Sequence, residues 1–98
     1  MNVEFADSKL DRLEEDAQFQ VGYADAVVRG FRKVMQAIRA ASDERDLYAL
    51  KSLHFEKLKG DRSHQRSLRI NQQWRLIIEI EERNKEHCVQ VIGIEDYH

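Results

Sequence analysis

The chain has 98 residues, of which 35% are charged and 42% apolar, and its formal net charge is −2 at pH 7. This balance indicates one well-solvated globular domain over residues 1–98. No run approaches the roughly 20 apolar residues that span a bilayer. The single cysteine, Cys88, cannot form an internal disulfide, and the N-terminal sequence lacks the apolar stretch of a secretory signal. We therefore expect a cytoplasmic protein without membrane association.

The first half of the chain is predicted to be mainly helical. Residues 2–5 fit a short edge strand, and a short helix with a polar cap is expected over 8–15. Apolar residues then recur at steps of three and four over 21–41, which predicts a long amphipathic helix. Basic residues lie off its apolar stripe, where a solvated face is favoured over a nucleic-acid contact: Arg29, Arg32, Lys33 and Arg39. Ser42 is expected to cap a third helix, which is buried through Leu47, Leu50 and Leu53.

The second half alternates between apolar and polar residues with a period of two, which is typical of strands. The predicted strands are 52–59, 65–70, 74–82 and 87–98, and the last is apolar on both faces and therefore central. Helices followed by strands predict an α+β fold, with the N-terminal helices packed on one face of a twisted antiparallel sheet of about four strands. In that arrangement Trp74 faces the helices and Arg75 lies on the open face.

A basic segment covers residues 57–75 and sums to +5, whereas the rest of the chain sums to −7. Such a cationic segment on an acidic protein predicts a polyanionic partner. Its basic residues are Lys57, Lys59, Arg62, Arg66, Arg69 and Arg75.

Metal and nucleotide chemistry find little support in the sequence. The four histidines and Cys88 show none of the spacings of common metal sites, and no glycine-rich phosphate loop or serine elbow is present. Acid–base chemistry without a cofactor remains, and RNA cleavage needs only a base, cations for the phosphorane and an acid. Glu56 or His54 is the candidate base, and Arg69 and Arg75 are the candidate cations. The candidate acids are the C-terminal Asp96, Tyr97 and His98.

Each of these residues also has a structural interpretation without chemistry. Glu56 next to Lys57 is the usual pattern of a surface ion pair, and a terminal Tyr97-His98 is commonly frayed. The functional interpretation depends on the residues converging in space.

Three motifs carry a resemblance to a known family. LKGDR at 58–62, SLRINQQWRL at 67–76 and EDYH at 95–98 are similar, in this order, to the RelE/ParE toxin superfamily, with HigB-like plasmid maintenance killer toxins as the nearest branch. The resemblance extends over residues 53–98 at the level of motifs. It implies a cytoplasmic type II toxin, an endoribonuclease that cuts mRNA in the ribosomal A site without a metal cofactor. It also implies a helix-turn-helix antitoxin, with promoter DNA bound only through the antitoxin complex.

The resemblance also assigns roles by position. Glu56 matches a catalytic carboxylate or histidine of relatives, Arg75 an arginine on the scissile phosphate, and Asp96, Tyr97 and His98 the catalytic tail. Lys59 and Arg69 match basic residues that touch RNA. His64 and Arg66 depart from the family pattern, so base stacking at position 66 is an open question. His54 remains an alternative base, on the face of Glu56 if residues 52–59 form one strand.

Two other functions stay open at this point. A non-catalytic gyrase poison of the ParE kind is disfavoured by the intact EDYH tail. A degenerate module that only binds its antitoxin is kept open by the departures at His64 and Arg66.

Overall fold

A computed structural model describes residues 1–16, 18–19 and 22–96. In this part of the chain one sheet has the strand order β1-β5-β4-β3-β2, and all neighbours are antiparallel except β1 and β5, which are parallel. The strands are β1 (Asn2–Phe5), β2 (Glu56–Lys57), β3 (Arg66–Arg69), β4 (Trp74–Arg83) and β5 (Glu86–Asp96). The helices are α1 (Ser8–Glu15), α2 (Asp25–Ala40) and α3 (Glu44–Ala49), with 3₁₀ turns η1 (Lys51–Leu53) and η2 (Gly60–Arg62).

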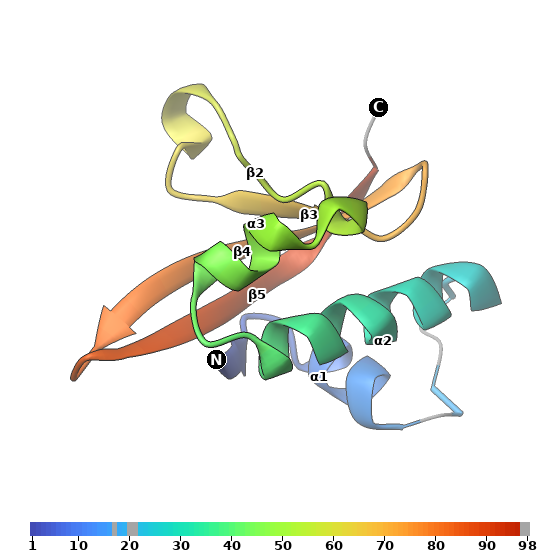
Figure 1. Ribbon diagram of the computed structural model, residues 1–98. Coiled ribbons are helices and arrows are strands. Elements are labelled where there is room, and N and C mark those ends of the chain that lie inside the picture. Colours follow the sequence, from blue (N-terminus) through green and yellow to red (C-terminus); the bar gives the residue numbers. More distant parts are fainter. Residues whose placement is uncertain (17, 20–21, 97–98) are drawn as a thin grey trace.

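The predicted α+β class and the packing of helices on one face are confirmed. Figure 1 shows α1 and α2 on one side of the β4–β5 hairpin, and the loop that carries η2 on the other. The edge strand predicted at residues 2–5 is present and lies parallel to β5, so the sheet has five strands where about four were expected. This addition places β5 between β1 and β4, in agreement with its predicted central position.

The core lies between α2 and the sheet. Phe31, Met35 and Ile38 of α2 are fully buried, as are Leu76 and Ile78 on the facing side of β4. Burial of each such side chain contributes about 1.5–3 kcal/mol. This core fixes the helix-facing side of β4 and leaves the other side of the strand for polar residues.

Two helix boundaries differ from the prediction. α2 begins at Asp25 because Gly22 has a left-handed φ of +80° and Ala24 is extended. Asp43, not Ser42, caps α3, since its side chain accepts the N–H of Arg45. Leu50 is 46% exposed because it follows the end of α3, so its predicted burial is wrong.

The strand predicted over 52–59 is much shorter in the structure. Its first residues form η1, and His54 then adopts a left-handed conformation with φ of 45°. β2 therefore contains only Glu56 and Lys57. The expectation that His54 shares a strand face with Glu56 is wrong for this reason.

Strand pairing places a row of polar residues on the face away from the helices. Arg75 of β4 is paired with Arg69 on one side and Glu95 on the other, and residues directly opposite share a face. A bulge at Ile92 shifts the register between Val91 and Gly93. Because of this extra residue, Glu95 points to the side of Arg75 rather than to the core.

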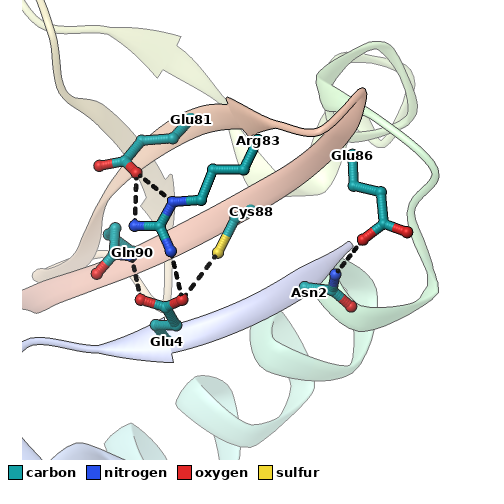
Figure 2. A network of polar contacts seen from close by, with 7 residues as sticks. All are labelled: Asn2, Glu4, Glu81, Arg83, Glu86, Cys88 and Gln90. Atoms are coloured by element: carbon teal, nitrogen blue, oxygen red, sulfur yellow. Dashed lines mark hydrogen bonds and ion pairs between the residues drawn. The ribbon is translucent and has the colours of Figure 1, made fainter.

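A polar network covers the far end of the same face and ties β1 to the sheet (Figure 2). Glu4 accepts hydrogen bonds from Gln90 at 2.6 Å and Arg83 at 2.7 Å, and from the Cys88 thiol at 3.6 Å. The hydrogen bond from Gln90 lowers the pKa of the Glu4 carboxyl, and the charge of Arg83 acts in the same direction. Burial and then the charge of Glu4 raise the pKa of the Cys88 thiol. None of the helices formed by the described residues is long and apolar enough to cross a bilayer.

Candidate functional site

A pocket of about 220 Å³ opens on the face away from the helices, where β2 and the η2 segment meet the end of β5. Its lining combines two arginines, three carboxylates, one hydroxyl and two apolar side chains. These residues are Glu56, Leu58, Arg62, Ser67, Arg75, Ile77, Glu95 and Asp96.

Arg75 forms the buried wall of this pocket. Its Nη2 atom donates to the backbone oxygen of His54 at 3.1 Å, to Oε1 of Glu56 at 3.0 Å and to Oγ of Ser67 at 3.0 Å. The residue is only 8% exposed, although it lies on the open face as predicted. The reason is that the segment leading into β2 folds over the guanidinium, so this part of the face is covered rather than bare.

Glu56 supplies a carboxylate beside that cation. Its side chain is 56% exposed and pairs with Arg75 at 3.0 Å. The contact with the guanidinium uses Oε1 of Glu56, and the exposed carboxylate lines the pocket. The pair therefore sets a proton acceptor and a fixed positive charge side by side.

A second ion pair forms the opposite rim. Arg62 contacts both carboxylate oxygens of Glu95, at 2.7 and 3.0 Å, and this contact raises the pKa of Arg62. The neighbouring Asp96 accepts a hydrogen bond from Nε2 of Gln73 at 3.1 Å. Tyr97 and His98, the other predicted acids, lie outside the described residues.

His54 lies next to the pocket but does not line it. Its Nε2 is 3.1 Å from Nη1 of Arg69. A guanidinium only donates, so a hydrogen bond here would use Nε2 of His54 as the acceptor. His54 thus lies at the margin of the site, and Glu56 is the carboxylate inside it.

The predicted RNA-binding residues do not share one face. Arg66 is paired with Ile78, whose side chain is in the core, and its Nε lies 3.9 Å from a carboxylate oxygen of Glu44 on α3. Lys57 is paired with Arg66 and belongs to the same row. Strand alternation separates these two from Arg69 and Arg75, so the basic residues of β2, β3 and β4 are divided between the two faces of the sheet.

Lys59, in contrast, is exposed just before η2. The RNA-contact roles of all these basic residues stay predictions.

Sequence reasoning missed two of the polar residues that line the pocket, Ser67 and Glu95. Ser67 is 2% exposed, and its hydroxyl joins the partners of Arg75. The sequence signal that could have identified Ser67 is its alternation with the apolar Leu68. In a strand, this alternation places Ser67 on the same face as Arg69. In the sequence, Glu95 belonged to the EDYH motif but had no assigned role. Its orientation depends on the bulge at Ile92.

Within the described ranges, no group of three His, Cys, Asp or Glu side chains is arranged to hold a metal ion. The positive charge in the pocket comes from Arg62 and Arg75.

Comparisons with known proteins agree with this architecture. A family model described as the RelE-like toxin of the type II toxin-antitoxin system HigB matches residues 3–93. No curated protein matches the sequence.

Three solved structures share the fold. One is the YoeB/ParE toxin from Agrobacterium tumefaciens, with 21% identity, complete coverage of both chains and a TM-score of 0.63. YafQ from E. coli has 12% identity, covers 98% of this chain and 92% of its own, and has a TM-score of 0.63. The YoeB–YefM complex from Staphylococcus aureus has 17% identity, covers 100% and 97%, and has a TM-score of 0.60. At these identities the likeness shows the fold alone.

Proposed function

Because the chain belongs to the RelE-like HigB toxin family of type II toxin-antitoxin systems, we propose that it is a ribosome-dependent endoribonuclease that cuts mRNA and thereby stops translation. The observation that carries the proposal is the Glu56–Arg75 pair, 3.0 Å apart at the pocket. A carboxylate next to an arginine is the minimal arrangement for abstracting a proton beside a phosphate.

In the proposed reaction, Glu56 removes the proton of a ribose 2′-hydroxyl, and the 2′-oxygen attacks the adjacent phosphorus. Arg75 stabilises the negative charge of the phosphorane, because its guanidinium is already fixed by protein contacts. The bond to the 5′-oxygen then breaks, and an acid of the C-terminal tail (Asp96, Tyr97 or His98) protonates the leaving oxygen. The products are a 2′,3′-cyclic phosphate and a free 5′-hydroxyl.

This chemistry assigns no step to a metal cofactor, since Arg75 and Arg62 supply the positive charge in the pocket. We further propose that the protein acts in the cytoplasm, where the ribosomal A site presents the mRNA to Arg69 on the open face and to Lys57 and Lys59 along the edge strand β2 and just after it. The partner that neutralises it is a helix-turn-helix antitoxin, and promoter DNA is bound only by the complex of the two. A structure titled the YoeB–YefM complex is among the similar folds, which supports a protein partner.

The direct test uses purified protein with ribosomes programmed with a defined mRNA. We expect cut ends within the A-site codon, and a cyclic phosphate on the upstream fragment. Glu56→Gln keeps an oxygen for Arg75 but removes the base, so it should slow cleavage by about 10²–10⁴-fold. Glu82→Gln, an exposed change near the β4–β5 turn, is the matched control and should cleave like the wild type.

Two outcomes would contradict the proposal. One is intact mRNA with the wild-type protein, especially if DNA gyrase is inhibited instead. The other is cleavage by Glu56→Gln at the wild-type rate, which would remove this carboxylate from the reaction.

A further inference from the structure

One residue beside the pocket has a backbone conformation that is uncommon outside glycine. His54 has a φ of 45° and a ψ of 47°, in the left-handed region. Among the described residues other than glycine, Asn84 and Lys85 also have a positive φ. These two form the loop between β4 and β5, and a two-residue hairpin loop often requires a positive φ at both positions. His54 is not in a hairpin loop, so its conformation has a different cause.

The backbone of His54 joins η1 to the buried arginine of the pocket. Its N–H donates to the oxygen of Lys51 at 3.1 Å and closes η1, and a left-handed residue commonly ends a helix in this way. Its own oxygen accepts a hydrogen bond from Nη2 of Arg75 at 3.1 Å. Figure 1 shows that the chain then returns as β2. Because φ and ψ set the directions of the N–H and carbonyl groups, the left-handed conformation lets one residue make both contacts.

The residues on either side hold this conformation in place. Leu53 and Phe55 are each 7% exposed, and the ring of Phe55 packs edge-on against that of Tyr48, with 4.7 Å between the centroids. A change of His54 to an extended conformation would move one of these neighbours out of the core. An unfavourable backbone conformation persists only where its surroundings determine it in this way, and such conformations cluster at functional sites.

The side chain of His54 is less involved in the pocket than its backbone is. The residue is exposed, it is not among the described lining residues, and its Nε2 lies 3.1 Å from Nη1 of Arg69. Glu56, two residues later, does line the pocket and contacts the same Nη2 of Arg75. The turn at His54 therefore brings a backbone oxygen and a carboxylate to one nitrogen of the guanidinium.

We propose that His54 is a positioning residue for RNA cleavage and that it acts through its backbone. Its left-handed conformation directs the carbonyl oxygen to Arg75, which fixes the guanidinium beside Glu56 before the substrate binds. The base is then Glu56, and the imidazole takes no part in proton transfer. The inference rests on the proposed function in naming the reaction, whereas the contact between His54 and Arg75 can be tested without it.

The first test replaces His54 by residues that differ in how readily they become left-handed. Glycine does so freely, alanine at a cost, and β-branched valine least of all. All three variants lose the ring contact with Arg69, so differences among them report the backbone. In the assay on programmed ribosomes, kcat should fall in the order His54→Gly, His54→Ala, His54→Val. We expect valine to lower kcat about tenfold or more and glycine to restore it to within about threefold of the wild type.

Lys85 provides the matched control, because it is also left-handed and follows the far end of β4. Lys85→Val creates the same backbone conflict in the β4–β5 turn. It should lower the melting temperature and leave kcat within about twofold of the wild type. Melting temperatures of all the variants verify that each is folded.

The second test uses a double-mutant cycle and does not depend on the reaction. Urea denaturation of His54→Val, Arg75→Ala and the double variant gives three effects on the unfolding equilibrium constant. The combined effect should differ from the product of the single effects by about threefold or more, since residues in contact are coupled. The cycle of Lys85→Val with Arg75→Ala should be multiplicative within about twofold, because these residues lie at opposite ends of β4. His54→Ala replaces the valine variant in the cycle if the latter does not fold.

Three results would overturn the proposal. Equal losses of kcat in His54→Gly and His54→Val would show that the imidazole itself takes part in the reaction. Wild-type kcat in all three variants at position 54 would remove the residue from the site. A multiplicative cycle between His54 and Arg75 would show that the contact does not hold the arginine. If the wild type leaves mRNA intact but the cycle shows coupling, the positioning of Arg75 is supported and the endonuclease proposal alone fails.

Discussion

Arg75 combines a structural and a chemical role in one side chain. Its Nη2 serves three acceptors, the backbone of His54, the carboxylate of Glu56 and the hydroxyl of Ser67. Two N–H groups on one nitrogen are thus shared among three oxygens, which fixes the plane of the guanidinium. Such preorganisation is what electrostatic stabilisation of a phosphorane requires, since the charge is in place before the reaction.

Arg75→Ala is therefore expected to lower stability as well as abolish cleavage. Truncation leaves the partners of a buried arginine without their donor, which costs about 1–3 kcal/mol of unfolding free energy. From the position of Arg75 on the open face alone, the Arg75→Ala substitution would have been expected to leave the fold unaffected. Urea denaturation measures the difference, with Arg69→Ala as the control, because Arg69 is half-buried and has fewer contacts of this kind. An Arg75→Ala protein as stable as the wild type would contradict the role of these hydrogen bonds.

Cys88 is expected to be a slow thiol whose reactivity depends on Glu4. Burial first and the Glu4 carboxylate second raise its pKa, so at pH 8 the reactive thiolate is scarcer than in a free cysteine. Glu4→Gln removes the negative charge, lowers the pKa and should speed alkylation. Mass spectrometry after timed iodoacetamide treatment gives the rate, and Glu86→Gln, which contacts Asn2 and not Cys88, should leave it unchanged. Equal rates in all three proteins would show that the carboxylate does not act on the thiol.

At the scale of elements, the close contact between α2 and the end of β3 depends on Gly30. Alanine in a helix is normally favoured over glycine by about 1 kcal/mol, but here its Cβ would lie 2.8 Å from the backbone oxygen of Ile70. We expect Gly30→Ala to lower the melting temperature, because the backbone cannot move without shifting the helix. Gly93→Ala has nothing within 4 Å of the added Cβ and should be neutral. A stabilised Gly30→Ala protein would mean that helix propensity exceeds the cost of this contact.

The elements that the sequence predicted well are those with long, uninterrupted patterns. The apolar period over 21–41 and the alternation after Trp74 identified α2 and β4, because burial on one face repeats over many residues. The strand over 52–59 failed because a 3₁₀ turn and a left-handed residue, His54, interrupt it, and neither leaves a periodic signal. The meeting of Glu56 with Arg75 follows from how β2 pairs with β3, which a local pattern does not contain.

The convergence at the pocket was expected from motifs rather than from periodicity. Asp96 lines the pocket together with Glu56 and Arg75, although the three are far apart in the sequence. Ser67 and the Arg62–Glu95 pair were missed, since they depend on strand register and on one extra residue in β5. Glu95 makes the rim of the pocket more acidic than the net charge of residues 57–75 suggested.

At the scale of the whole molecule, the segment beside η2 has an excess of positive charge and the tip of the β4–β5 hairpin a small excess of negative charge. Figure 1 shows the η2 segment on one side and the tip of the β4–β5 hairpin projecting away from it. The tip carries three exposed acids, Glu81, Glu82 and Glu86, against two exposed bases, Arg83 and Lys85, whereas Lys57 and Lys59 are exposed on the segment beside η2. A molecule charged in this way approaches a polyanion with the pocket end forward, because the acidic tip is repelled.

Ribosome binding should therefore weaken steeply with salt. If about three to five cations replace counterions on rRNA and mRNA phosphates, the logarithm of the association constant falls with the logarithm of salt concentration with a slope of about −2 to −4. Lys59→Ala should reduce that slope by about 1, because it removes one phosphate contact. Lys85→Ala, an exposed lysine in the β4–β5 turn, has the same loss of charge at the acidic end and should leave the slope unchanged. The measurement is a titration of ribosome binding between low and physiological salt. Identical slopes for the two variants would contradict the proposed approach with the pocket end forward. Binding that does not depend on salt would contradict the electrostatic contact itself.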